Sequence, residues 1–203
     1  MKRKINNVDI LILVCSCLFV ILTCMVLSNK FILIDSYFQS LMLNIRSNGL
    51  TDTMMIITNI GSSYTLIAIS FLLLFLLKKK KNALFILINL ICSFACSQVF
   101  KFIIRRSRPS TEGLVDTVGY SYPSGHTMVS ICFFGFITYL LCKKEKTNVK
   151  KFFICLLYLL TIFFIGFSRI YLGAHYFSDV IAGGLLSIIY LCLFIRFLNR
   201  KEA

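Results

Sequence analysis

The 203-residue chain has few charged residues and few residues that break regular structure. Charged side chains make up 15% of it, and it contains 10 glycines and 2 prolines. Soluble chains have about 25% charged residues, and disordered or collagen-like chains are much richer in glycine and proline. These shortages exclude a disordered protein and a collagen-like repeat.

Apolar residues fill most of the chain. They make up 58% of the sequence, and the mean hydropathy is +0.86. A soluble domain of this composition would aggregate, so the sequence predicts an integral membrane protein. We expect a single domain over residues 1–203 with an all-α fold.

Six apolar runs are candidates for membrane-spanning helices. About 20 residues in a helix that rises about 1.5 Å per residue cross a hydrocarbon core of about 30 Å. The predicted spans lie at about residues 8–28, 54–77, 83–104, 127–142, 152–167 and 177–198. The first run is too long for a cleaved signal peptide, so we expect it to remain as a helix. The fourth and fifth runs are short, which indicates that neighbouring polar residues complete those helices.

The segment at about residues 31–46 lies between the first two spans. Ile34, Phe38 and Leu41 recur at helical spacing, whereas Asp35 and Arg46 interrupt the apolar pattern. We therefore expect an amphipathic helix in the outer membrane interface rather than a seventh span.

The net charge of +14 is unevenly divided between the two predicted membrane faces. Fifteen of the 22 cations lie on one face: Lys2, Arg3, Lys4, Lys78, Lys79, Lys80, Lys81, Lys143, Lys144, Lys146, Lys150, Lys151, Arg196, Arg200 and Lys201. By the positive-inside rule this face is cytoplasmic, so we expect both termini in the cytoplasm. Most of the other cations gather near one outer site, which topology does not explain.

The nine cysteines all fall inside the apolar runs. A disulfide framework would place them in the outer loops, and a zinc site would pair them with other ligands at short spacing. The sequence therefore predicts small buried hydrophobic residues and no zinc site.

Ionisable residues at membrane depth form three groups near the predicted outer surface. Each such residue costs about 2.5–3.5 kcal/mol on insertion scales, so these residues tend to mark function. In the first group, Lys101 and Arg108 would project from nearly the same face of a helix that Pro109 ends. The alternative is a plain basic helix end that reaches lipid headgroups.

The second group, residues 122–126, comes directly before the fourth span. Ser124 suits the N-cap of a helix, and Gly125 lets the backbone approach a ligand closely. The N–H groups at a helix start bind phosphate and disfavour a charged imidazolium at His126. The alternative is a capped helix with an incidental histidine.

The third group runs from Ser168 and Arg169 to His175 and Asp179. If the sixth span starts near His175, Asp179 lies one turn later on the same face. Its carboxylate can hold one imidazole nitrogen and leave the other free as a nucleophile. The alternative is that His175 and Asp179 only stabilise the start of the helix. That alternative would not explain why Arg169 lies nearby on the same predicted side of the membrane. Together the three groups suit phosphoryl transfer, which depends on positioning and on neutralised charge.

The three groups closely resemble the signature of the type 2 phosphatidic acid phosphatase (PAP2) superfamily, which includes membrane lipid phosphatases and is related to vanadium haloperoxidases. The matching residues are Lys101, Arg108 and Pro109; Pro123, Ser124, Gly125 and His126; and Ser168, Arg169, His175 and Asp179. The resemblance extends to residues 59–62 and to the six-helix layout. Phe177 stands where relatives often carry proline.

The resemblance implies a role for each site residue. His175 would attack phosphorus and form a phosphohistidine, Asp179 would orient it, and His126 would serve as general acid and then as general base. The phosphoryl oxygens would be held by Lys101, Arg108, Ser124, Gly125 and Arg169. The resemblance also implies no metal and no other cofactor, because these cations stand where a metal would sit.

The leading expectation is a lipid phosphatase with an extracytoplasmic active site. A phosphotransferase to another lipid acceptor stays open, as does a non-catalytic anionic-lipid binder or transporter, although the latter has no use for the two histidines. The resemblance points to undecaprenyl diphosphate, phosphatidylglycerophosphate or phosphatidate without choosing among them. We expect membrane lipids as partners and no nucleic acid, and the oligomeric state stays open.

Overall fold

The computed structural model describes residues 6–109 and 113–202, and within them the chain forms eight helices and no strand. The helices are α1 (Asn7–Leu27), α2 (Ile32–Asn44), α3 (Asn48–Ile60), α4 (Ser63–Leu76), α5 (Lys80–Ile104), α6 (Gly125–Lys144), α7 (Asn148–Tyr171) and α8 (Phe177–Glu202). The predicted all-α fold is confirmed. The predicted cytoplasmic cations Lys2, Arg3 and Lys4 lie outside the described residues, as does the side chain of Lys201.

Five helices, α1, α5, α6, α7 and α8, are long and apolar enough to cross a membrane. Helices α3 and α4 pass the same test only as a pair, bent by 48° at the break between them. The predicted second span at 54–77 is therefore not one straight helix. The break follows from a new N-cap, because the Ser62 hydroxyl accepts a hydrogen bond from the Thr65 N–H at 3.2 Å and so starts α4.

The two short runs of the sequence become full-length helices, as predicted. Helix α6 begins at Gly125 with Ser124 as its N-cap, and it already includes His126. Helix α7 extends past the apolar run through Arg169 to Tyr171. Polar residues of the motifs thus form the first turn of α6 and the last turn of α7.

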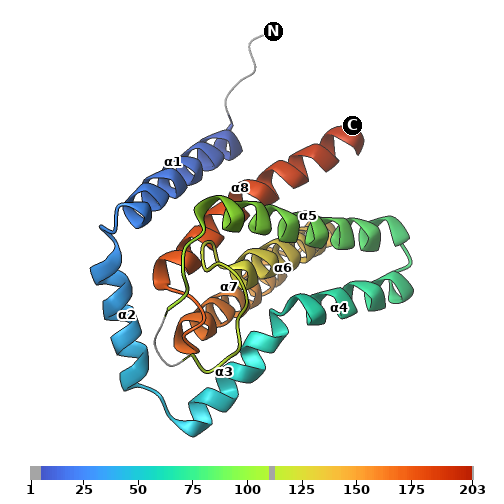
Figure 1. Ribbon diagram of the computed structural model, residues 1–203. Coiled ribbons are helices and arrows are strands. Elements are labelled where there is room, and N and C mark those ends of the chain that lie inside the picture. The colour runs from blue at the N-terminus through green and yellow to red at the C-terminus, as the bar shows by residue number, and fades with distance from the viewer. Residues whose placement is uncertain (1–5, 110–112, 203) are drawn as a thin grey trace.

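Helix α6 lies at the centre of the bundle (Figure 1) and contacts α4, α5, α7 and α8. Helix α1 packs on α8, while α2 and α3 pack on α7. The first half of α6 is enclosed by these neighbours, so that Met128, Cys132 and Phe133 are fully buried. The N-terminus of α6 is consequently held firmly by several helices.

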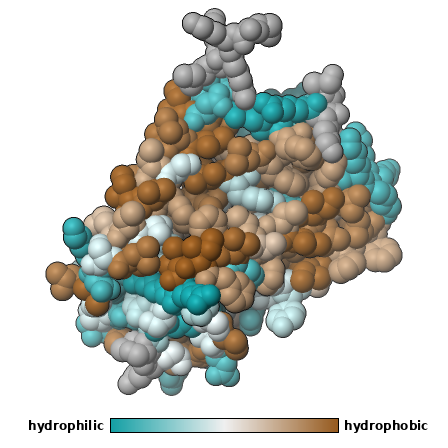
Figure 2. Space-filling view, turned by 45° about the horizontal axis from the view of Figure 1, so that its top comes forward, coloured by the Kyte–Doolittle hydropathy of each residue, from teal (hydrophilic) through white to brown (hydrophobic). Residues whose placement is uncertain are grey.

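Apolar side chains also cover the outside of the bundle. Leu33 and Phe75 are each 80% exposed, and Phe163 is 62% exposed. Figure 2 shows apolar residues over much of one face, with hydrophilic residues gathered toward its margins. Since water would not tolerate so large an apolar surface, this exterior faces lipid.

The nine cysteines are free thiols. Cys15 and Cys132 are buried in the protein, as predicted for all nine. The prediction is wrong for the exposed cysteines, Cys17, Cys24, Cys92 and Cys155. These residues lie on the outer sides of their helices, because an apolar run in a membrane protein contacts lipid as well as neighbouring helices.

Helix ends that carry the predicted cytoplasmic cations meet at one end of the bundle. Arg196 near the end of α8 pairs with Asp9 in the first turn of α1 at 2.7 Å. The Tyr139 hydroxyl of α6 donates to Asn199 Oδ1 of α8 at 2.9 Å. Lys79, before α5, borders the same small cavity as these two residues. The charge pattern of the sequence therefore corresponds to one face of the fold.

Helix α2 occupies most of the segment expected to form an amphipathic helix. Its Phe38 ring stacks on Phe177 at the start of α8, with ring centroids 3.9 Å apart. Met42 packs against Ile170 in the core between α2 and α7. Asp35, which the sequence presents as a polar interruption, is fully buried and faces the site described next.

Candidate active site

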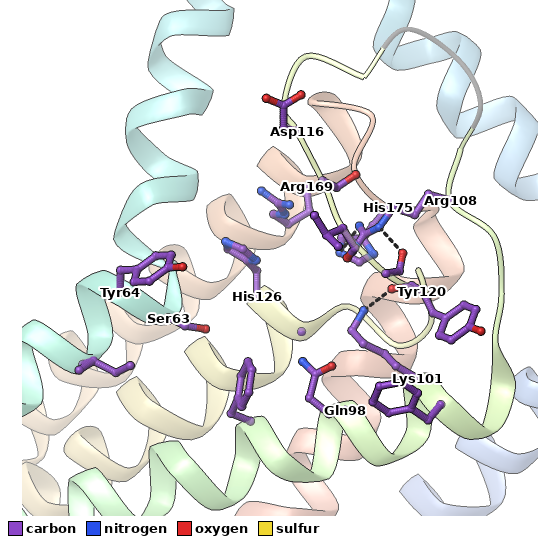
Figure 3. A pocket seen from close by; sticks show the side chains of 17 residues that line it. Ser63, Tyr64, Gln98, Lys101, Arg108, Asp116, Tyr120, His126, Arg169 and His175 are labelled. Atoms are coloured by element: carbon purple, nitrogen blue, oxygen red, sulfur yellow. Dashed lines mark hydrogen bonds between the residues drawn. The ribbon is translucent and has the colours of Figure 1, made fainter.

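A cavity of about 570 Å³ lies at the end of the bundle where α5 and α7 finish and α6 begins. Figure 3 shows side chains from these helices and from the loop before α6 around it. Six of the eight predicted site residues line it: Lys101, Arg108, Gly125, His126, Arg169 and His175. The other two, Ser124 and Asp179, are fully buried behind its wall.

His175 lies in the short link between α7 and α8 and is only 2% exposed. Its Nδ1 is 3.5 Å from Asp179 Oδ2, and its Nε2 is 3.4 Å from Nη1 of Arg108. Burial lowers the pKa of His175 to about 4, although Asp179 opposes this shift. The ring is therefore neutral at pH 7, and Nε2 is the nitrogen that a substrate in the cavity would meet.

Asp179, in the first turn of α8, is held on both carboxylate oxygens. The Ser121 hydroxyl donates to Oδ2, as does the Tyr176 N–H at 2.9 Å. Nη1 of Arg106 donates to Oδ1 at 2.6 Å. Sequence reasoning missed Ser121 and gave Arg106 no role, because neither belongs to the recognised motifs.

Lys101 occupies the last turn of α5 and is 7% exposed. Its Nζ donates to the Tyr120 carbonyl at 2.6 Å and lies 3.4 Å from the Ser121 carbonyl. The ammonium group thus ties α5 to the loop before α6 while it remains on the cavity wall.

Arg108 reaches the cavity from an extended segment and not from a helix. Helix α5 ends at Ile104, where Arg105 adopts a left-handed conformation with φ of 52° and its N–H donates to the Lys101 carbonyl. The prediction that Lys101 and Arg108 share one helical face is therefore wrong. The chain turns at Arg105, and the next residue, Arg106, forms ion pairs on the other side of the site.

Three backbone carbonyls hold the Arg108 guanidinium in place. Nε donates to Gly119 at 2.9 Å, Nη2 to Val118 at 3.0 Å and Nη1 to Ala174 at 2.8 Å. Burial lowers the pKa of Arg108, and the Asp179 carboxylate counters this effect. Arginine stays protonated over the physiological range, so a fixed positive charge stands beside Nε2 of His175.

Arg169, in the last turn of α7, is 4% exposed. Its Nη1 donates to Thr58 Oγ1 of α3 at 2.6 Å. Its Nε has no hydrogen-bond partner in the described part of the chain, although it is buried. A buried N–H without an acceptor is unfavourable. Arg169 also lines the cavity, where its charge attracts an anion.

The start of α6 forms the floor of the cavity. The Ser124 N–H donates to the Asp179 carbonyl at 2.9 Å, and Ser124 Oγ accepts a bond from Thr127 Oγ1 at 3.0 Å. Within residues 6–109 and 113–202, the N–H groups of Gly125 and His126 have no acceptor. Ser124 therefore caps the helix, and the next two N–H groups are free donors at a helix N-terminus, a kind of site that suits anions.

His126 occupies the second position of α6 and is partly exposed to the cavity. Figure 3 shows its ring beside Arg169, across the cavity from Lys101. The cavity therefore brings together both histidines of the chain, three cations and a helix N-terminus. Among the described residues, no three His, Cys, Asp or Glu side chains are placed to share a metal ion.

Comparisons with known proteins identify relatives of this chain. The model of the PAP2 superfamily matches residues 82–203, which include all three motifs. Phosphatidylglycerophosphatase B of Bacillus subtilis is 30% identical over 150 residues, which cover 71% of this chain and 73% of the relative. An undecaprenyl-diphosphatase of Sulfolobus acidocaldarius is 30% identical over 145 residues, 68% of this chain and 65% of the relative.

Solved structures show the same similarity. The transmembrane PAP2 type phosphatidylglycerolphosphate phosphatase of Bacillus subtilis superposes with a TM-score of 0.85 at 27% identity, over 93% of this chain and 96% of the other. LpxE of Aquifex aeolicus superposes with a TM-score of 0.62 at 25% identity, over 79% of this chain and 93% of the other. The chain is therefore a multi-pass membrane protein that belongs to the PAP2 superfamily.

Proposed function

We propose that the protein is a lipid phosphatase that works through a phosphohistidine formed on His175. The observation that carries this proposal is the place of the His175 imidazole between Asp179 and Arg108, on the wall of a cavity lined by cations. The relatives named as phosphatidylglycerophosphatase and undecaprenyl-diphosphatase support a lipid phosphate as the substrate class.

In the first step, the lone pair on Nε2 of His175 attacks phosphorus. The bond from phosphorus to the bridging oxygen breaks, and this oxygen leaves with a proton from the protonated His126. The imidazole ring becomes positively charged, and the Asp179 carboxylate beside Nδ1 stabilises it. The non-bridging oxygens are bound by Lys101, Arg108, Arg169 and the N–H groups of Gly125 and His126, supported by the Ser124 cap.

In the second step, neutral His126 takes a proton from water while the water oxygen attacks phosphorus. The bond from phosphorus to Nε2 breaks, its electron pair returns to His175, and inorganic phosphate leaves. The same residue thus serves as acid and then as base, which restores both histidines after one turnover.

The proposed site faces the extracytoplasmic side of the membrane. The cation-rich helix ends lie at the opposite end of the bundle, and the positive-inside rule assigns that end, with both termini, to the cytoplasm. Apolar residues of α4 and α5, Ile67, Phe94 and Phe102, also line the cavity. A lipid chain could lie along them while its phosphate reaches the cations.

A panel of lipid phosphates tests the proposal. Purified protein in detergent with EDTA should release phosphate from at least one of phosphatidylglycerophosphate, undecaprenyl diphosphate and phosphatidate, and His175→Gln should release none. Substrate labelled with ³²P should transiently label His175 in the wild type. Equal turnover in His175→Gln would refute the proposal.

The same panel separates the alternatives. Label that appears only in an acceptor lipid would indicate a phosphotransferase. Lipid binding without turnover would indicate a binding protein or transporter.

A further inference from the structure

Arg106 lies between two buried carboxylates that come from opposite ends of the chain. Its Nη1 pairs with Asp179 Oδ1 of α8 and its Nη2 with Asp35 Oδ2 of α2, each at 2.6 Å. Both carboxylates have 0% exposure, and the guanidinium is mostly covered. Two short contacts from one planar group fix its orientation.

Ser178 closes this network into a ring. Its hydroxyl accepts a hydrogen bond from Arg106 Nη1 at 2.7 Å and donates to Asp35 Oδ2 at 2.7 Å. Its N–H donates to Asp35 Oδ1 at 2.9 Å. Asp35 is therefore held by the backbone of α8 as well as by Arg106.

The charges in this hydrogen-bond network show why Arg106 affects Asp179, the carboxylate beside the proposed nucleophile. Burial disfavours its charged form, but Asp179 and Asp35 outweigh this effect and raise the pKa of Arg106. The aromatic ring of Tyr176 also covers the guanidinium, and Cζ of Arg106 lies 4.0 Å from the centroid of that aromatic ring. Without Arg106, two buried carboxylates would share one site with no cation between them, which is strongly unfavourable.

We propose that Arg106 is a positioning residue for the phosphatase reaction and that Asp35 of α2 anchors it. Arg106 occupies Oδ1 of Asp179 and leaves Oδ2 turned toward Nδ1 of His175. The network thereby fixes the carboxylate whose Oδ2 lies 3.5 Å from Nδ1 of the nucleophile. This inference depends on the proposed function and extends it to α2, which has no part in the recognised motifs.

The competing view is that Arg106 only ties α2 to the bundle. On that view, loss of Arg106 lowers stability and the amount of folded enzyme but leaves kcat per folded molecule unchanged. A positioning role instead lowers kcat and leaves KM nearly unchanged, because Arg106 lies behind the cavity wall and does not bind substrate.

Steady-state kinetics of matched variants on an active lipid phosphate separate these views. Arg106→Gln should lower kcat about 100-fold, as expected when a reacting group is displaced by about 1 Å. Asp35→Asn, which keeps the pair of Arg106 and Asp179, should lower kcat less. The double variant Arg106→Gln/Asp35→Asn should have a higher kcat than Arg106→Gln alone. It removes the Asp35 carboxylate, one of the two that Arg106→Gln leaves unpaired. Arg105→Gln is the control, since Arg105 is exposed and its Nε bonds only to its own helix.

Chemical rescue gives a second readout. A cavity of about 300 Å³, lined in part by Asn29, Ser107 and Tyr176, reaches Arg106 from outside the substrate cavity. Added guanidinium should therefore restore part of the kcat lost in Arg106→Ala, whereas ammonium at the same ionic strength should not. Arg105→Ala should not respond.

The outcomes distinguish the inference from the function on which it depends. If the wild type and Arg105→Gln release no phosphate from any lipid, the proposed function fails. If they are active and folded Arg106→Gln keeps its kcat, the inference is overturned. If Arg106→Gln does not fold, Asp35→Asn decides, and an unchanged kcat in that variant also overturns it.

Discussion

Nη1 of Arg108 lies 3.4 Å from Nε2 of His175 and at the same time donates to the Ala174 carbonyl at 2.8 Å. The residue before the candidate nucleophile thus holds the cation that faces it. A phosphate attacked by Nε2 would lie against this guanidinium, so the position of the charge is set before substrate binds.

Arg108→Lys keeps the charge but loses the planar fork that contacts three carbonyls. We expect kcat/KM for lipid phosphate to fall about 100-fold or more, in line with the loss of one donor to a developing negative charge. Arg105→Lys, at an exposed site nearby, should retain activity. Steady-state phosphate release measures both variants, and wild-type activity in Arg108→Lys would contradict a role for the fixed guanidinium.

The low pKa of His175 predicts an unusual titration. Burial holds this pKa at about 4, below the ordinary value of 6.5, so the ring should stay neutral through mildly acidic pH. The folded state binds fewer protons there than the unfolded state does. The stability from this group is therefore fully present above pH 6.5 and is lost as the pH falls toward 4.

The chain has 2 histidines, which makes this titration measurable by NMR of ¹⁵N-histidine-labelled protein in detergent. His126→Asn leaves only the His175 signal. A midpoint near pH 6.5 for that signal would show that the ring is not shielded as the structure indicates.

Thr58→Val removes the partner of Arg169 with little change in shape. The Thr58 hydroxyl accepts from Nη1 at 2.6 Å, so the variant leaves a buried guanidinium with one more unpaired N–H. The free energy of unfolding should fall by about 1–3 kcal/mol, since the variant leaves an unsatisfied buried group. We also expect kcat/KM to fall about 10-fold, because the Arg169 guanidinium loses a contact that fixes its position. Thr53→Val is the control, because the Thr53 hydroxyl bonds only to the Gly49 carbonyl of its own helix. Equal effects of the two variants would count against the contact between α3 and α7.

Two adjacent glycines of α8 test how closely this helix approaches the start of α6. A Cβ on Gly183 would lie 2.8 Å from the Ser124 carbonyl oxygen, whereas a Cβ on Gly184 would be 3.9 Å from its nearest neighbour. Gly183→Ala should therefore destabilise the protein by about 1–3 kcal/mol and disturb the helix cap at the cavity. Gly184→Ala should be neutral or slightly stabilising. Thermal unfolding in detergent compares them, and equal melting temperatures would rule out the close approach.

Much of the candidate site was predictable because its signals are local. Ser124 caps α6 where the sequence predicts, since an N-cap depends on its own hydroxyl and the next few N–H groups. Likewise, His175 and Asp179 lie near each other because they are four residues apart at a helix start. Neither relationship requires knowledge of distant segments.

The sequence was less informative where long-range contacts decide the backbone. The predicted third span ends at residue 104, as α5 does, but the expectation that the helix itself continues to Pro109 was wrong. Nothing local stops the helix before Pro109, and the turn at Arg105 accompanies the ion pairs of Arg106. The bend between α3 and α4 was also missed, since the apolar run of residues 54–77 continues across the break between the two helices.

Composition and charge pattern alone predicted a helical membrane protein with most of its cations at one end, because apolar length and charge placement act on each segment independently. Only the tertiary structure showed that Asp35 reaches Arg106 from 71 residues away and that Thr58 reaches Arg169 from 111 residues away. Such pairings depend on which helix faces which. The packing of the whole bundle determines which helices face each other, and no local sequence pattern around Asp35 or Thr58 indicates their partners.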